Sequence, residues 1–197
     1  MSEIARPELT FPEAEAARLR AAYEAASAIL EYGSGGSTVM AAEMEAKRIF
    51  SVESDRDWAQ MMRGWFAANP PARDSAVEII WSDIGATKEW GYPKTNDEYL
   101  RFARYPLEVW QLPEFVQPQV VLVDGRFRAG CAMATALSTR EPLTLFVDDY
   151  KRRTQYHRIE QWLGPAKLTG RMAEFEVQPM DCAATDLLTI IEMMLKP

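Results

Sequence analysis

Short apolar segments alternate with helix-forming segments along most of this chain, and this alternation limits the fold more than any other feature. The strand-like segments are residues 28–32, 48–53, 76–83, 118–125, 143–149 and 170–177. Strands that are separated by helices pair in parallel through right-handed crossovers. The runs VVLV and LFV have the continuous apolar character of parallel strands buried on both faces. The sequence therefore predicts an α/β fold, a doubly wound, mostly parallel open sheet with helices on both faces.

The segments between these strands, and the two ends of the chain, carry the helix signals. The expected helices are residues 12–27, 37–46, 54–69, 95–105, 128–138, 150–163 and 184–195. Ser37 is the expected N-cap of the second helix, and Pro70 and Pro71 end the third. The last segment also suits a strand because of its β-branched residues, and a helix is favoured.

Length and charge restrict the class of protein. With 197 residues and a formal net charge of −7, the chain suits one domain, residues 1–197, and lacks the basic surface that non-specific nucleic-acid binding needs. Residues 86–116 form a long connection that we expect to be a lid or insertion. Signal-peptide and membrane-spanning patterns are absent from the sequence. Cys131 and Cys182 have no metal-ligand spacing. These features predict a cytoplasmic protein without nucleic-acid or membrane partners.

The segment ILEYGSGGSTVMAAE, residues 29–43, joins the first predicted strand to a helix through a glycine-rich loop. Open α/β sheets bind ligands beyond the carboxyl ends of their strands, which places this loop at a crevice. A dinucleotide loop would have a third glycine where Thr38 stands, and a P-loop would need a lysine that is missing here. A tight turn without any ligand is the alternative.

An acidic residue stands at or near the end of each of the first four predicted strands. They are Glu31, Glu53, Asp83 and Asp124. Glu53 lies about 20 residues after Gly33, the spacing at which an acid binds ribose hydroxyls in dinucleotide folds. One such acid alone could be a solvated residue or a helix cap, but four in succession form a pattern. Together with Glu31-x-Gly33-x-Gly35-Gly36-Ser37, this pattern resembles the class I S-adenosylmethionine-dependent methyltransferases, nearest to those that methylate small molecules on oxygen.

The resemblance implies specific roles for these residues. Gly33, Ser34, Gly35 and Gly36 would approach the methionine moiety of the donor, S-adenosylmethionine, and Glu31 would orient this loop or reach the donor's amino group. Glu53 would bind the ribose, and Asp83 with Ile84 would flank the adenine. Asp124 would be the catalytic residue beside the methyl-transfer centre, where a hydroxyl acceptor needs a base.

Two other functions stay open beside methyl transfer to a small molecule. One is a non-catalytic protein that binds S-adenosylmethionine. The other is an NAD-type oxidoreductase of the same architecture, which Thr38 disfavours.

A magnesium site is compatible with the resemblance but is not favoured. Macrocin-type sugar O-methyltransferases cluster carboxylates at the fourth and fifth strand ends, where this chain has Asp124 and the pair Asp148 and Asp149. Those enzymes carry a further acid where this chain has Arg126, and a guanidinium repels a cation. Asp148 and Asp149 could instead be acids at a helix N-terminus. We therefore expect no metal ligands.

The acceptor side of the crevice has a weaker signature. Trp90 and Tyr92, in an aromatic turn after Asp83, are candidate substrate contacts. Arg126 directly follows the fourth strand and is a candidate ligand for an anionic acceptor, together with Arg152 or Arg153. The competing interpretation pairs Arg126 with an acid such as Asp148 and leaves the other arginines on a solvated face. The oligomeric state stays open, and a homo-oligomer is compatible with the sequence.

Overall fold

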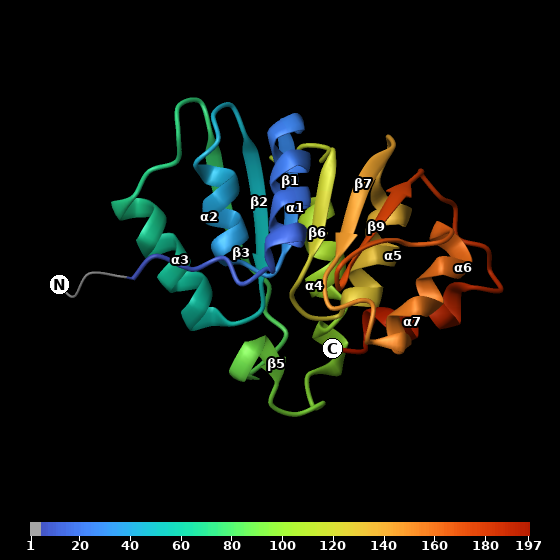
Figure 1. Cartoon of the computed structure of the whole chain (residues 1–197). Coiled ribbons are helices and arrows are strands. Elements are labelled where there is room, and N and C mark those ends of the chain that lie inside the picture. The colour runs from blue at the N-terminus through green and yellow to red at the C-terminus, as the bar shows by residue number, and fades with distance from the viewer. Residues whose placement is uncertain (1–4) are drawn as a thin grey trace.

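The structure, a computed structural model, describes residues 5–197. Its main sheet has the strand order β3-β2-β1-β6-β7-β9-β8 (Figure 1). These strands are β1 (Ala28–Tyr32), β2 (Arg48–Glu53), β3 (Ala76–Trp81), β6 (Val120–Val123), β7 (Leu143–Val147), β8 (Lys167–Thr169) and β9 (Met172–Val177). The first five in chain order pair in parallel, and β9 is antiparallel to both β7 and β8. The predicted doubly wound, mostly parallel sheet is confirmed, and β8 is a strand that the sequence pattern did not reveal.

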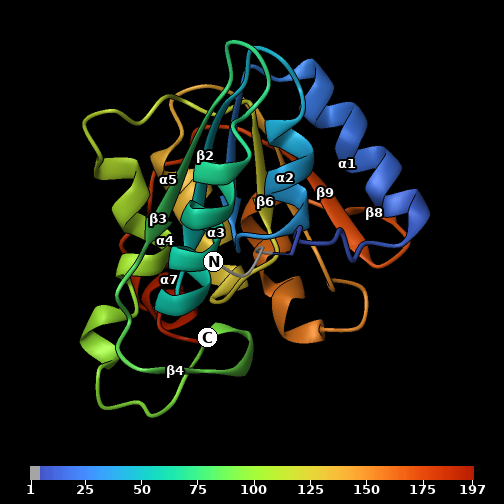
Figure 2. The ribbon, with the colours of Figure 1, turned by 90° about the vertical axis from the view of Figure 1, so that its left-hand side faces the viewer.

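The longer helices cover both faces of the sheet. They are α1 (Glu13–Ala25), α2 (Gly36–Ala42), α3 (Arg56–Ala68), α5 (Arg128–Ser138) and α7 (Leu187–Met194). Side chains of α1 and α2 pack in an apolar cluster on one face, whereas α5 and α7 belong to the cluster on the other, as the two sides of the sheet in Figure 2 show. The favoured helix at the C-terminal end is confirmed by α7. No helix in the described part of the chain is long and apolar enough to cross a membrane.

Two predicted helix boundaries are wrong. Residue 37 does not cap the second helix, because α2 begins at Gly36 with Gly35 as its N-cap, and it ends at Ala42. Residues 150–163 are not one helix: a 3₁₀ helix (Thr154–Ile159) is followed by the single turn α6 (Glu160–Leu163). The side chain of Tyr150 is buried, and the Lys151 N–H donates to the carbonyl of Arg171 in the turn between β8 and β9. These contacts hold residues 150 and 151 beside the hairpin, so the helical turns begin only after them.

The long connection, residues 86–116, is also not built around the one predicted helix at 95–105. It contains the two-stranded sheet of β4 (Thr87–Lys88) and β5 (Tyr92–Pro93), the one-turn helix α4 (Arg104–Leu107) and three 3₁₀ helices (Glu89–Gly91, Tyr99–Arg101 and Glu108–Gln111). Proline is tolerated in the first turn of a helix but not in its interior. Because Pro106 lies in α4, a helix that began at residue 95 could not continue through it. Phe102, Tyr105 and Val109 are buried against the sheet, so this connection contributes side chains to the core, whereas residues 94–100 are exposed.

Candidate active site

The crevice lies where the strand order reverses. The chain leaves β1 towards β2 and leaves β6 towards β7, and β1 and β6 are neighbours, so their loops diverge at the carboxyl end of the sheet. A cavity of about 720 Å³ opens there. Its wall contains the glycine loop after β1, Glu53 at the end of β2, and residues 124–126 after β6. This volume lies within the range of small-molecule sites, about 300–1,000 Å³.

Two glycines of the loop are required by close contacts. Gly33 has a φ of +103°, and a Cβ there would lie 2.7 Å from the backbone nitrogen of Gly125. A Cβ on Gly36 would overlap the backbone of Glu8. Gly35 differs, because a Cβ there would meet no atom within 4 Å, and Gly35 lines the cavity. The loop therefore leaves open space above its middle glycine.

Glu31 supports this loop from below. Its carboxylate accepts hydrogen bonds from the hydroxyls of Tyr23, at 2.7 Å, and Thr38, at 2.5 Å. The side chain is fully buried and is not part of the cavity wall. Burial raises the pKa of Glu31, whereas these hydroxyl donors lower it. Of the two roles expected for Glu31, this position suits orientation of the loop.

Glu53 lines the cavity and also organises the backbone around it. Its Oε1 accepts from the N–H groups of Ser54, at 2.7 Å, and Asp55, at 2.9 Å, and its Oε2 accepts from that of Ser34, at 3.2 Å. Burial raises the pKa of Glu53, and these backbone donors oppose the rise. Oε2 has one protein donor and therefore retains acceptor capacity on the cavity side.

Asp83 and Ile84, expected beside an adenine, are not part of the cavity wall. The Asp83 carboxylate accepts from Arg101 at 3.0 Å and from the backbone N–H of Gly85, and Ile84 is fully buried in the core. Two other acids line the cavity, Asp55 and Asp57 at the start of α3, together with Trp58 and Met61 of that helix. The structure thus does not bring Asp83 and Ile84 together with the glycine loop in one cavity.

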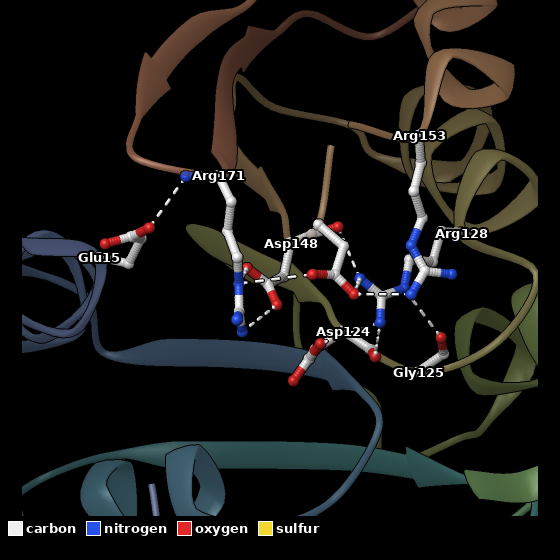
Figure 3. A network of polar contacts seen from close by, with 8 residues as sticks. Glu15, Asp124, Gly125, Arg128, Asp148, Arg153 and Arg171 are labelled. Carbon is white, nitrogen blue, oxygen red and sulfur yellow. Dashed lines mark hydrogen bonds and ion pairs between the residues drawn. The ribbon is translucent and has the colours of Figure 1, made fainter. Parts of the chain in front are cut away.

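Asp124 lies at the cavity beside a network of carboxylates and arginines (Figure 3). Arg128 is at the centre, with Nη2 3.1 Å from Oδ1 of Asp124 and Nη1 3.6 Å from Oδ2 of Asp149. Its guanidinium also donates to the backbone carbonyls of Asp124, Gly125 and Asp148. Arg128 therefore links the carboxylates of Asp124 and Asp149, and it holds Asp148 through the backbone carbonyl of that residue.

Two further arginines hold Asp148 and Asp149. Arg171 donates to both oxygens of Asp148 (Figure 3), at 2.9 and 2.8 Å, and Arg153 donates to Oδ2 of Asp149 at 2.9 Å. Among residues 5–197, no group of three acids, histidines or cysteines is arranged to hold a metal ion.

The protonation of Asp124 is set by this environment. About 31 % of its side chain is exposed. Burial of the remainder raises the pKa of Asp124 to about 7, the Arg128 charge opposes this rise, and the negative charges of Asp148 and Asp149 add to it. A carboxyl group with such a pKa exchanges protons readily near neutral pH.

Trp90 and Arg126 line the same cavity as Asp124, and Tyr92 contacts Arg126. Trp90 is 84 % exposed, has a φ of +63° and lines the cavity. Arg126 also lines it. Tyr92 does not, but its ring centroid lies 4.0 Å from the Arg126 guanidinium carbon. Asp148 is paired with Arg171 rather than with Arg126, and Arg152 is exposed.

The sequence pattern missed one wall of the cavity. It consists of residues 7–11, which precede α1 and lie across the glycine loop at Gly36. Trp58 of α3 was missed too, and its indole N–H donates to the Ser34 carbonyl at 2.8 Å. The spacing of Trp58 and Met61 on one helix face was the only signal that could have indicated the α3 contribution.

Comparison with known proteins gives a similarity at high identity. A crystal structure of a methyltransferase-like protein from Silicibacter pomeroyi is 53% identical, with 98% of this chain and 99% of that chain covered and a TM-score of 0.95. An O-methyltransferase from Bacillus cereus in complex with S-adenosylhomocysteine has 13% identity, 85% and 82% coverage, and a TM-score of 0.55. An O-methyltransferase of tomaymycin synthesis from Streptomyces achromogenes, in complex with S-adenosylmethionine, has 13% identity, 90% and 84% coverage, and a TM-score of 0.54. No protein-family model and no curated protein matches the sequence.

Proposed function

Because this chain belongs to the class I S-adenosylmethionine-dependent methyltransferases, we propose that it methylates a small molecule on an oxygen atom. The observation that carries this proposal is the shared cavity of the glycine loop, Glu53 and Asp124. These residues can supply donor binding and proton removal at one place. The sequence alone could only infer this proximity from strand order.

The cavity wall fits S-adenosylmethionine in its chemistry. Open space above Gly35 allows a ligand to approach the backbone, and the free acceptor capacity of Glu53 Oε2 suits ribose hydroxyls. Glu53, Gly33 and Gly35 would hold the donor, while Glu31 would keep the loop in place. When bound, S-adenosylmethionine supplies an electrophilic methyl group. Asp55 and Trp58, rather than Asp83 and Ile84, are the neighbours of this cavity that could contact the adenine.

Asp124 is the proposed general base. Its carboxyl lies at the cavity, and a pKa of about 7 leaves it able to accept the proton of an acceptor hydroxyl near neutral pH. Arg128, 3.1 Å away, holds the carboxylate in place. Asp124 would accept the proton of the acceptor hydroxyl when that oxygen takes the methyl group, with cleavage of the carbon–sulfur bond of the donor and release of S-adenosylhomocysteine.

Magnesium is not part of the proposal. Asp148 and Asp149 already accept from Arg171 and Arg153, and Arg128 provides positive charge beside Asp124. A magnesium ion would have to displace these guanidinium groups from its oxygen ligands.

We further propose that only part of the 86–116 connection acts as a lid in a single domain. Trp90 is exposed and lines the cavity, and Gly91 beside it contacts the hydroxyl of Ser54 through its carbonyl. These residues are placed to cover a bound ligand, whereas Phe102 and Tyr105 pack in the core.

The proposed function is tested by separating donor binding from turnover. S-adenosylhomocysteine formation is measured with S-adenosylmethionine and a panel of hydroxylated small molecules, for the wild type and Asp124→Asn. We expect the variant to bind S-adenosylhomocysteine with nearly unchanged affinity and to turn over about 10²–10⁴ times more slowly. Equal turnover would remove Asp124 from the chemistry. Donor binding without turnover on any acceptor would indicate the non-catalytic binding protein.

A further inference from the structure

Arg126 is a buried cation that lacks a protein counter-ion. Its residue surface is only 9 % exposed, and its Nε is buried without a hydrogen-bond partner. Among the described residues, 5–197, no carboxylate oxygen lies within 4.0 Å of its guanidinium nitrogens. Burial of a charge without a partner is unfavourable, so an arginine in this state needs a compensating group.

The neighbouring arginines show how different Arg126 is. Arg128, Arg153 and Arg171 each contact at least one carboxylate within 3.1 Å, and all three appear in the network of Figure 3. Arg153 was one of the expected partners of Arg126 in binding an anion, but its charge is already paired with Asp149. Of these four guanidinium groups, Arg126 is the one that lines the cavity.

The Tyr92 ring compensates the Arg126 charge only in part. Its centroid is 4.0 Å from the guanidinium carbon, so the ring covers one face of the cation. The N–H groups of a guanidinium point outwards in its plane, and a ring over the face does not accept from them. Tyr92 therefore holds the guanidinium in position without neutralising its charge.

We propose that Arg126 binds a carboxylate or phosphate group of the methyl acceptor, so that the acceptor is a small anion. The planar donors of arginine match these groups in geometry. Arg126 lies two positions after Asp124 in sequence, and both line the cavity. A bound anion would thus lie on the side of the proposed base. This assignment rests on the proposed function.

The electrostatics at Tyr92 agree with this position. Burial acts to raise the pKa of Tyr92, but the positive charges of Arg126 and Arg153, together with hydrogen bonding to these two side chains, outweigh it, and the pKa is lowered. A phenol whose ionised form is favoured reports positive potential at its oxygen. An acceptor anion bound to Arg126 would reduce this potential and raise the pKa of Tyr92.

The methionine carboxylate of the donor is the other anion that could reach the cavity. Arg126 contacts Tyr92 of the 86–116 connection, and its side chain has no hydrogen bond to the glycine loop that would hold the methionine moiety. We therefore assign Arg126 to the acceptor.

The test uses inorganic phosphate as the probe, titrated calorimetrically at constant ionic strength into protein with and without saturating S-adenosylhomocysteine. The variant is Arg126→Met, and the control is Arg152→Met, which removes the same charge from an exposed side chain. We expect Arg126→Met to weaken phosphate binding at least about tenfold. Arg152→Met should change it by less than about twofold, because exposed charges are screened. Arg126→Met should leave S-adenosylhomocysteine affinity unchanged.

Three results overturn the proposal. They are no phosphate binding by the wild type, equal phosphate affinity in Arg126→Met, and a matching loss of S-adenosylhomocysteine affinity in that variant, which would assign Arg126 to the donor carboxylate. Failure of the wild type to bind S-adenosylhomocysteine would count against the proposed function, while the titration without it still decides whether Arg126 binds anions. If Arg126→Met does not fold, a measurement on the wild type replaces it. Phosphate should then raise the pKa of Tyr92, and an unchanged pKa would contradict the proposal.

Discussion

The hydroxyl of Thr38 donates a 2.5 Å hydrogen bond to the carboxylate of Glu31, and both side chains are fully buried. The same hydroxyl accepts from the backbone N–H of Gly35 at 2.9 Å. Thr38 stands where a dinucleotide loop would have its third glycine. Through these two hydrogen bonds, Thr38 connects the end of β1 to the glycine loop, which a glycine at this position could not do.

Thr38→Val should destabilise the protein by about 1.5–3 kcal/mol, because a buried carboxylate loses one of its donors. The matched control is Thr135→Val, whose buried hydroxyl donates only to the helix carbonyl of Cys131 and should cost about 0.5–1.5 kcal/mol. Urea unfolding measures both. An equal cost for the two variants would contradict the supporting role of Glu31.

Gly33→Ala should be more destabilising than Gly164→Ala. Both glycines have positive φ, +103° and +77°, and that conformation alone costs alanine about 1–3 kcal/mol. A Cβ on Gly33 would also meet Gly125 at 2.7 Å, whereas the position at Gly164 has open space. Thermal unfolding of both variants isolates the contact between the β1 and β6 loops. Equal midpoints would mean that this contact relaxes without cost.

Much of the fold follows from local sequence. β1 and β2 match their predicted boundaries residue for residue, because a strand buried in a parallel sheet is a mainly apolar segment that stands out from its neighbours in the sequence. The prediction fails where a tertiary contact decides. The predicted helix does not begin at residue 150, because the Lys151 N–H bonds the Arg171 carbonyl instead of a helix carbonyl. A contact between residues 20 positions apart cannot be predicted from a local sequence pattern.

The candidate site likewise contains some residues that the sequence could predict and others that it could not. Glu53 and Asp124 could be placed at the crevice because a strand end in a parallel sheet has a fixed edge. Asp83 also follows a strand, but Arg101 holds it away from the cavity wall. Residues 7–11 were missed because their position over Gly36 depends on how the chain enters α1.

Gly35→Ala should separate stability from donor binding. Its φ of 176° is extended backbone that alanine also adopts, and a Cβ there meets nothing within 4 Å. We expect a change in unfolding free energy below about 0.5 kcal/mol. Affinity for S-adenosylhomocysteine should fall at least about tenfold, because the new methyl group occupies cavity space next to the loop. Calorimetry that finds unchanged affinity would place the donor elsewhere.

Asp124→Asn should alter how stability depends on pH. The pKa of Asp124 is raised from 3.8 to about 7 on folding, so between these values the folded state binds more protons than the unfolded state, and wild-type stability falls as pH rises. Asparagine removes this fall. The variant should gain about 1–2 kcal/mol relative to wild type between pH 4 and 8, a value reduced for the exposed part of the side chain. Parallel pH profiles in urea unfolding would show that Asp124 has an ordinary pKa.

The central claim, that the glycine loop and Glu53 bind S-adenosylmethionine, is tested most directly by calorimetry with S-adenosylhomocysteine. The proteins are the wild type, Glu53→Gln and the exposed control Glu45→Gln, each checked for folding by its unfolding midpoint. We predict binding by the wild type and the control, and at least about tenfold weaker binding by Glu53→Gln, because charge-assisted bonds to the ribose are lost. Unchanged affinity in Glu53→Gln, no binding by the wild type, or tighter binding of NAD would contradict the account.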